Sequence, residues 1–510
     1  MRALPQRAAM AGIVGLQLMT TMLVGEQPSN SATDHIPAER LHRLELRIDG
    51  LTEALAAAER QVEEDRRGMQ AMRTELEELR KTLTDGGPDT AERVNARATG
   101  QLQQAVSEVR EEQEMLGSEV RQHEQTKLES SSKFSVRFRG LVLFNAFVNE
   151  GAVDQPDLPT SALQRIPGQS HGSVGAGLSQ TMLSFEGTGP SLWNGRLFAD
   201  ASLDFFAGVS AGGLSAPAGL ARMRSAGIAW EWSRDLLRAG YDSPLISPLS
   251  PDSLADVAQP SLAWSGNLWV WAPQLRWEHR IALSGGRETT VELGLYDPSY
   301  SQVNAVEANR SVTPGEAARQ PGYEMRLSYR AGNNSSALQM GASGYYDRKY
   351  YGSGQTVDAW AGAADWRLPV TAHGQWSGEF YRGRGIGSLG GGAYPDAYTY
   401  ADPETNETET SGLDSIGGWT QWQWNFNRTM QLNAVAGQDT GYAGELRSNM
   451  TPGPDWLGYN SRNRSLMANF IFRPWSSVAI SPEFRRLTSW PIAGTANWAN
   501  AYTLSAGYQF

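Results

Sequence analysis

The sequence contains no cysteine, so disulfides, thiolate metal sites, a cysteine nucleophile and a lipid-modified cysteine anchor are all excluded. Histidine is scarce, with 6 in 510 residues. After the first two dozen residues, no apolar stretch is long enough to form a transmembrane helix. A surplus of basic residues is also missing, since the formal net charge is −11, and this argues against nucleic acid as a partner.

The residues of turns and of membrane interfaces are abundant instead. The chain has 54 Gly, 17 Trp and 17 Tyr. Its mean hydropathy of −0.44 is polar. Transmembrane barrels share this property, because each of their strands exposes only half of its side chains to lipid.

Residues 1–32 are expected to form an export signal. Arg2 and Arg7 supply a basic start, and residues 8–24 are almost entirely apolar. The apolar run is brief and has no stop-transfer flank, which favours a removed signal over a membrane anchor. The pattern leaves the cleavage position open.

Residues 33–85 are predicted to form an α-helical coiled coil. Their apolar side chains recur at steps of three and four, and such a seam can be buried only against another helix. The seam consists of Leu41, Leu44, Ile48, Leu51, Leu55, Val62, Met69, Leu76, Leu79 and Leu83. A single solvated helix is the alternative, but leaving so regular a seam in water is costly. Self-association is therefore predicted, and the repeat does not fix the number of helices.

Residues 86–132 are expected to form a second helical segment and a linker. Gly86-Gly87-Pro88 ends the coiled coil, because this combination breaks helices. A weaker helical repeat follows, and Ser130-Ser131-Ser132 is typical of a linker.

Residues 133–510 are predicted to form an antiparallel transmembrane β-barrel of about sixteen strands. Here the period changes to two: Val142, Phe144 and Val148 share one face of the first strand, and Asn145 lies on the other. The predicted strands lie near 134–148, 178–187, 195–206, 221–232, 236–243, 273–283, 288–297, 322–331, 336–347, 356–368, 373–383, 416–426, 430–438, 464–473, 477–487 and 500–510. The fold class is thus an all-β membrane protein preceded by a coiled coil.

The connections between these strands support a membrane barrel over a soluble sandwich. Every second connection is short, such as 284–287 and 427–429. The others, such as 243–272 and 384–415, are mostly long and rich in turn residues. Outer-membrane barrels alternate short periplasmic turns with long external loops, whereas a soluble sandwich has no reason to sort its loops in this way.

Aromatic residues add to this interpretation. Phe510 ends a last strand with aromatic residues on one face, and this resembles the terminal strand that the barrel-insertion machinery reads. Several tryptophans lie near predicted strand ends, where they would form girdles at the membrane interfaces. They are Trp232, Trp277, Trp366, Trp422, Trp424 and Trp475.

Several stretches resemble a central hairpin of porins. Residues 222–232 form an arginine-bearing strand, and 236–242 end in a Gly-aromatic-Asp corner. Residues 247–254, 266–269 and 273–276 continue the likeness. With a coiled coil before the barrel and no cysteine, the chain resembles the DcaP-like trimeric porins. The resemblance implies a homotrimer and the diffusion of small, often anionic, solutes.

The polar parity of the strands predicts which side chains line the lumen. Charges at alternate positions are costly against lipid but are solvated in a channel, where opposite charges create a transverse field that selects solutes. The residues predicted to line the pore and set its selectivity are, by parity, Arg196, Asp200, Asp204, Arg238, Arg276, Glu278, Arg326 and Arg485, and, because they border the glycine-rich stretch 383–392, Arg382 and Arg384. For each of them, an ion pair that only stabilises the wall remains the alternative.

Two stretches depart from the simple pattern. Arg222 and Arg224 share a parity with the apolar residues of their strand, so a bulge or an early strand end is expected there. Residues 385–390 match the dinucleotide-binding fingerprint, but no helix follows them. We interpret 383–392 as a flexible loop that can fold towards the pore.

These observations predict an outer-membrane porin with its stalk in the periplasm, through which small hydrophilic solutes diffuse. A preference for organic anions is the accompanying hypothesis. The expected partners are further copies of the chain, outer-membrane lipid, small hydrophilic solutes and the insertion machinery; no cofactor or metal is expected. One alternative is a structural envelope tether. Another is a barrel hydrolase, which would need a His beside a Ser, but His171, His279 and His373 have no suggestive neighbours.

Overall fold

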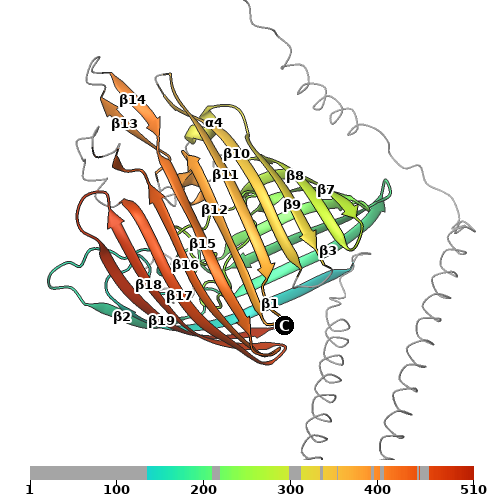
Figure 1. Cartoon of the computed structure of the whole chain (residues 1–510), viewed down its shortest axis with the longest axis horizontal. Helices are drawn as coiled ribbons and strands as arrows, with labels where there is room; N and C mark the ends of the chain where they lie inside the picture. Colours follow the sequence, from blue (N-terminus) through green and yellow to red (C-terminus); the bar gives the residue numbers. More distant parts are fainter. Residues whose placement is uncertain are drawn as a thin grey trace, which may run out of the picture. The chain divides into compact units, whose positions relative to one another are not determined.

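The computed structural model describes residues 135–208, 219–297, 312–332, 337–352, 354–391, 395–401, 407–444, 447 and 459–510. The expected export signal (1–32), coiled coil (33–85) and second helical segment (86–132) lie outside these residues, as does the whole seam from Leu41 to Leu83. They remain predictions. The described residues form an antiparallel β-barrel (Figure 1).

The barrel closes between its first and last strands. β1 (Val136–Glu150) pairs with β19 (Asn497–Gln509). β2 (Gly172–Gly177) and β3 (Met182–Leu192) both pair with β1, along its end and its beginning respectively, so they are two parts of one barrel strand. The seventeen strands that the structure describes in this sheet therefore occupy sixteen positions around the barrel.

The other barrel strands follow one another in chain order. They are β4 (Gly195–Asp204), β5 (Arg222–Glu231), β6 (Asp235–Asp242), β7 (Ala272–Leu283), β8 (Arg287–Tyr296), β9 (Gly322–Ala331), β10 (Leu338–Gly352), β11 (Gln355–Pro369), β12 (Gly374–Arg384), β15 (Asp414–Asn425), β16 (Met430–Gly441), β17 (Asn460–Trp475) and β18 (Val478–Pro491). Every neighbouring pair is antiparallel, and closure pairs the backbone groups of the first and last strands, which would otherwise be open edges.

Side chains alternate between the two faces of the wall as the sequence predicts. In β1, Val142, Phe144 and Val148 point outward and are 43–49% exposed. Asn145 and Asn149 point inward and are 2% exposed. The outer face is therefore apolar and the inner face polar, which is the arrangement that lipid outside and a polar interior require. Among the described residues, no helix has the length and apolar character needed to cross a membrane.

All sixteen predicted strand regions are strands in the structure, but three further strands were not predicted. β2 has Val174 as its only large apolar side chain, so it shows no alternation that a sequence could reveal. β13 (Ala397–Ala401) and β14 (Thr408–Gly412) form a hairpin outside the barrel sheet. This hairpin lies within a connection that was expected to be a loop.

The connections differ at the two ends of the barrel. Tight turns lie at one end: Trp193 and Asn194 both have left-handed φ angles, of 48° and 61°, and Gly285 and Gly286 have φ angles of 76° and 67°. The longer connections lie at the other end and include α4 (Pro314–Ala317) and the 3-10 helix η2 (Gly387–Leu389). We call this second end the loop end.

Candidate solute pathway

The connection between β6 and β7, residues 243–271, lies inside the barrel and is called the inner loop below. Many of its residues are buried, among them Leu245, Ile246, Leu262 and Leu268, each 2% exposed. The sequence predicted a long external loop here. The structure corrects this, because these apolar residues have inner-wall partners that an external loop would lack.

Carboxylates of the inner wall hold the first half of the inner loop. Glu324 on β9 accepts a hydrogen bond of 2.9 Å from the backbone N of Leu245. Glu379 on β12 accepts from the Ser247 hydroxyl and, at 2.6 Å, from the backbone N of Leu249. Both carboxylates thus bind backbone groups of the inner loop.

The second half of the inner loop is bound by side chains on β18 and between β2 and β3. The Ser253 hydroxyl donates to Glu483 on β18 at 2.5 Å, and Arg485 pairs with Asp256. Gln180, between β2 and β3, donates to the carbonyl of Ala255 at 2.7 Å. The loop therefore crosses the interior from β9 to the seam of the barrel.

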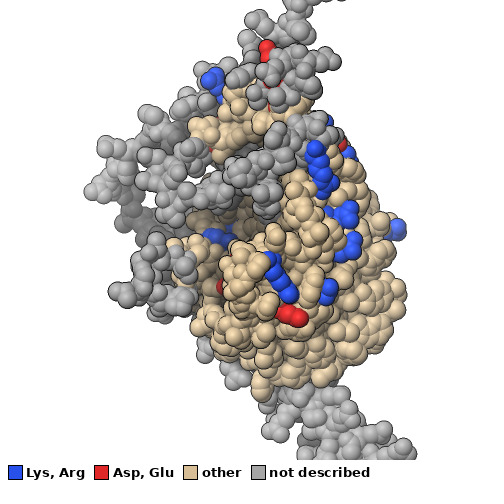
Figure 2. Space-filling view, turned by 90° about the vertical axis from the view of Figure 1, so that its left-hand side faces the viewer, with Lys and Arg blue, Asp and Glu red and all other residues tan. Residues whose placement is uncertain are grey.

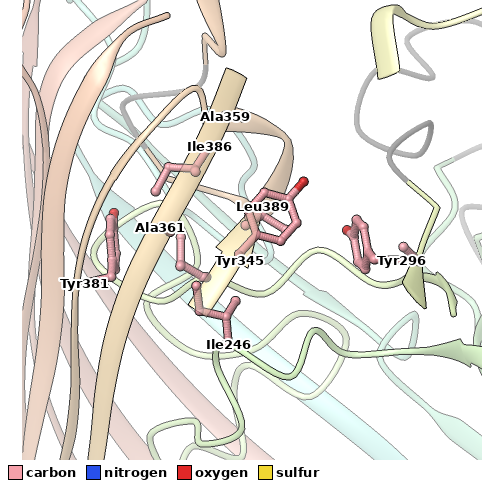
Figure 3. Packing of buried hydrophobic residues seen from close by; sticks show 10 residues of the cluster. Ile246, Tyr296, Tyr345, Ala359, Ala361, Tyr381, Ile386 and Leu389 are labelled. Atoms are coloured by element: carbon pink, nitrogen blue, oxygen red, sulfur yellow. The ribbon is translucent and has the colours of Figure 1, made fainter. Parts of the chain in front are cut away.

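Apolar packing supports the same path (Figure 3). Ile246 of the inner loop packs in one cluster with Tyr345 on β10, Tyr381 on β12 and Ala361 on β11. Leu249 and Leu262 belong to a second cluster with Trp419, Val435 and Met467 on the next strands. The inner loop thus covers the wall from β9 to β18 with both polar and apolar contacts.

The glycine-rich stretch 385–391 also packs inside the barrel. All its residues are buried, and the carbonyl of Leu389 accepts a hydrogen bond of 2.9 Å from the backbone N of Trp269. Buried Lys349 donates to the Gly385 carbonyl at 2.9 Å and to the Ser388 hydroxyl at 2.7 Å. The stretch therefore folds towards the interior as expected, but it is a packed element rather than a free loop.

Two of the predicted pore arginines are buried in ion pairs of the covered wall. Arg326 pairs with Glu292 at 2.7 Å and with Asp365 at 2.8 Å. Arg485 pairs with Asp256 and, at 2.8 Å, with Glu483. Both arginine side chains are 6% exposed. For Arg326 and Arg485, the geometry therefore favours a role in stabilising the wall over a role in solute selectivity.

The strands from β4 to β7 have further charged side chains on the inner wall, and the inner loop contacts them as well. On β5, Arg222 and Arg224 donate hydrogen bonds to the loop carbonyls of Ala258 and Val257. Arg238 pairs with Asp200 at 2.5 Å and with Asp242 at 3.2 Å. Its register partner on the next strand is Arg276, which donates to the Ser243 carbonyl and to Gln274, both at 2.9 Å. In the part of the chain that the structure describes, Arg276 has no carboxylate partner.

The departure from parity in β5 is a β-bulge. The register with β4 shifts between Ser202 and Leu203, so that Arg224 has no position opposite it. As a result, Arg222 and Arg224 both turn inward to Asp204, at 2.7 Å and 3.9 Å, and both lie over the ring of Trp271. These two arginines are not among the predicted pore residues, although their broken parity in the sequence is the signal that marks them.

The other predicted lining residues have simpler surroundings. Glu278 lies on the inward parity of β7 and accepts a hydrogen bond of 2.5 Å from Arg280. Arg196 shares the inward parity of Asp200 and Asp204 on β4 and is exposed. Figure 2 shows the loop end, where a hollow contains Lys or Arg side chains.

Arg382 and Arg384 do not line the pore. On β12 they share the parity of Trp376 and Phe380, which are exposed on the outer face. Arg382 lies over the ring of Tyr442 at 4.9 Å and pairs with Asp414 at 3.0 Å. The prediction for these two residues is wrong, because the inward parity belongs to Glu379 and Tyr381.

Phe510 closes the barrel next to β1. Its backbone exchanges hydrogen bonds of 2.9 and 3.0 Å with Gly140, and its ring centroid lies 5.5 Å from that of Phe138. A Cβ at Gly140 would lie 2.3 Å from the Phe510 ring, so the glycine makes room for this contact. Its role as an assembly signal remains a prediction.

The geometry gives no support to a hydrolase. His279 points outward, stacks on Trp277 and contacts Asp235 at 2.8 Å. Among the described residues, no group of three or more His, Cys, Asp or Glu side chains is placed to hold a metal.

No family model matches the sequence, and neither does any curated protein sequence. Solved structures do match. The outer membrane channel DcaP of Acinetobacter baumannii is 14% identical, with 76% of this chain and 100% of that chain covered and a TM-score of 0.57. This barrel has the fold of an outer-membrane channel. The anion-selective porin from Comamonas acidovorans (10% identity; 74% and 100% covered; TM-score 0.47) and OprB of Pseudomonas putida (12%; 74% and 94%; 0.42) are more distant. The resemblance to DcaP-like porins is thus confirmed for the channel fold of the barrel.

Proposed function

We propose that this chain is a porin of the bacterial outer membrane that lets small hydrophilic solutes diffuse and favours organic anions. The fold supports the channel, and the charge on the inner wall supports the preference. Arg222 and Arg224 share the single carboxylate of Asp204, and Arg276 has only neutral acceptors among the described residues. This surplus of guanidinium charge lies on the inner wall beside the inner loop, where the local field outweighs distant, screened charge.

Other features keep the preference moderate. Asp200 and Asp242 neutralise Arg238, and Glu278 lies close to Arg280. A solute carboxylate would therefore find its strongest partners at Arg276 and at the pair beside Trp271. Guanidinium groups remain charged in such surroundings and bind carboxylates with two parallel hydrogen bonds.

The assembly that we propose is a homotrimer with the coiled coil in the periplasm. The regular seam from Leu41 to Leu83 supports self-association, and the resemblance to DcaP-like porins supports the number three.

Channel recording in planar bilayers tests the proposed function. Purified protein should conduct, and its reversal potential in a salt gradient should indicate a preference for anions. The double variant Arg224→Gln/Arg276→Gln should lower the anion-to-cation permeability ratio roughly tenfold, because a focused charge of one sign changes local ion concentrations by at least that factor.

Arg382→Gln is the matched control, because this arginine lies on the outer face and should leave selectivity unchanged. Equal selectivity of the double variant and the parent protein would contradict the anion preference. A folded protein without conductance would contradict the channel itself and favour the tether.

A further inference from the structure

A cluster of arginines and tryptophans lies on the outer wall at the loop end, and we call it the rim patch. It consists of Arg462 and Arg464 on β17, Arg486 and Trp490 on β18, and Trp498 on β19. The guanidinium carbons of Arg462 and Arg464 lie 5.3 and 5.4 Å from the Trp490 ring centroid. That of Arg486 lies 5.0 Å from the Trp498 ring centroid.

The rim patch faces away from the lumen. Arg462 and Arg464 are exposed, whereas Asn463 and Ser465, which alternate with them, are buried against the interior. On β18, exposed Arg486 follows buried Arg485. The three arginines therefore belong to the outer surface and have no part in the proposed solute pathway.

The acceptors of these arginines are neutral. Arg464 donates to the side-chain oxygen of Gln438 at 2.8 and 2.6 Å, and Arg486 donates to that of Asn500 at 3.2 Å. Within the described part of the chain, no carboxylate pairs with the three arginines. The neighbouring carboxylate, Glu150, accepts a hydrogen bond from Asn500 at 2.8 Å instead.

Two other outward arginines at the loop end are paired with carboxylates, whereas Arg384 on β12 donates to the Ser411 hydroxyl at 2.8 Å. Arg348 on β10 pairs with Asp358 at 2.7 Å, and Arg382 on β12 pairs with Asp414 at 3.0 Å. The wall around β17 to β19 is thus distinguished by three neighbouring outward arginines, Arg462, Arg464 and Arg486, that have no carboxylate partner among the described residues.

Immediately below the rim patch begins the apolar outer face of the barrel. Arg486 lies opposite Leu466, and the next outward pair is Phe484 with Tyr502. These three neighbours are 45%, 38% and 48% exposed. The long connections of outer-membrane barrels lie on the external side, so the patch is at the level of the external headgroups, where tryptophan rings also gather.

We propose that the rim patch binds the phosphate groups of lipid headgroups in the outer leaflet. The proposal rests on the outer-membrane location stated above, but not on solute conduction. Arginine recognises phosphate with paired, charge-assisted hydrogen bonds, and three guanidinium groups without carboxylates offer several such donors. The adjoining apolar face favours a lipid over a free phosphate ion, because acyl chains can pack against this face while the phosphate groups bind the arginines.

Binding of lipid A to the full-length protein in detergent tests this proposal. The probes are bisphosphorylated lipid A, its dephosphorylated form and inorganic phosphate. We expect the triple variant Arg462→Gln/Arg464→Gln/Arg486→Gln to bind bisphosphorylated lipid A at least about tenfold more weakly, because hydrogen bonds to charged groups are among the strongest. Arg348→Gln, in which the lost guanidinium was already paired, should bind as the parent protein does. Heat-modifiable migration on gels should show that both variants are folded.

Several results would overturn the proposal. Equal binding by the triple variant, or equal binding of the dephosphorylated lipid by the parent protein, would show that the arginines do not recognise phosphate. Binding of inorganic phosphate as tightly as lipid A would show a free-anion site. Efficient disulfide cross-linking between copies of an Arg464→Cys variant would show that the patch is covered by another subunit. Conductance, measured in parallel, should be the same in the triple variant and the parent protein, so failure of the channel function is detected separately.

Discussion

At the scale of single residues, two glycines allow contacts that hold the barrel and its inner loop in place. Gly266 has a φ of +105°, and a Cβ there would lie 2.1 Å from the carbonyl oxygen of Gly418 on the wall. Because the obstacle is backbone, it cannot move aside as a flexible side chain would. Gly140 makes room in the same way for the ring of Phe510.

Replacement of Gly266 by Ala should loosen the inner loop from β15. Positive φ at a residue with a side chain costs about 1–3 kcal/mol, and the backbone clash adds to this. We expect a lower unfolding temperature and a noisier open-channel current. Gly168→Ala is the control, since Gly168 also has a positive φ, of +87°, but nothing within 4 Å of the added Cβ. Equal effects of the two substitutions would show that the clash is unimportant.

Replacement of Phe510 by Asp should lower the amount of heat-modifiable barrel in the outer membrane. The substitution removes the ring contact with Phe138 and places a charge beside the exposed, lipid-facing side chains of the seam. Quantitative blotting of membrane fractions before and after heating measures the effect. Normal amounts of folded protein would contradict the assembly role of this residue.

At the scale of elements, the inner loop depends on a small number of buried wall groups. Glu379 is the central one, because it accepts hydrogen bonds from Ser247, from the backbone of Leu249 and, at 3.2 Å, from the indole of Trp419. All three donors are buried and would lose their partner together.

Replacement of Glu379 by Ala should therefore release the middle of the inner loop. Leaving buried donors unsatisfied costs about 1–3 kcal/mol for each group. We expect a larger mean conductance and more frequent current fluctuations in single-channel records. Asp358→Ala removes an exposed carboxylate that pairs with outward Arg348 at 2.7 Å and should leave both quantities unchanged. A quiet Glu379→Ala channel of normal conductance would show that the loop is held by its apolar contacts alone.

Sequence patterns predicted the strands better than they predicted the inner loop. A strand in a membrane barrel shows its period locally, since lipid on one side and polar groups on the other impose it at every second residue. The path of residues 243–271 depends on partners such as Gln180 and Glu483, which lie far away in the sequence, and no local period records such contacts. The error at Arg382 has another source: this residue borders the glycine-rich stretch that was expected to fold towards the pore, whereas its local parity with Phe380 shows the outer face.

At the scale of the whole molecule, we expect the barrel and the predicted coiled coil to have separate roles. Because the barrel closes on itself through β1 and β19, we expect it to fold without the N-terminal region. The predicted seam from Leu41 to Leu83, in contrast, has no use in a lone chain.

Deletion of residues 34–127 should thus weaken subunit association and leave a folded barrel. Chemical cross-linking of the intact protein should give oligomers, and the deleted form should give mainly monomers at equal concentration. Heat-modifiability of the deleted form controls for folding. Cross-linking that gives only monomers from the intact protein would contradict the predicted self-association.

The inner loop also has a mechanical consequence. A thin cylindrical wall resists stretching, because its hydrogen bonds run around the circumference, but it flattens into an ellipse easily. A strut across the cylinder removes this soft mode by fixing the distance between opposite walls. The inner loop joins Glu324 on β9 to Glu483 on β18 and to Gln180 at the seam, and so spans the cylinder in this way. The aperture beside it should therefore keep its shape when lateral pressure in the membrane changes.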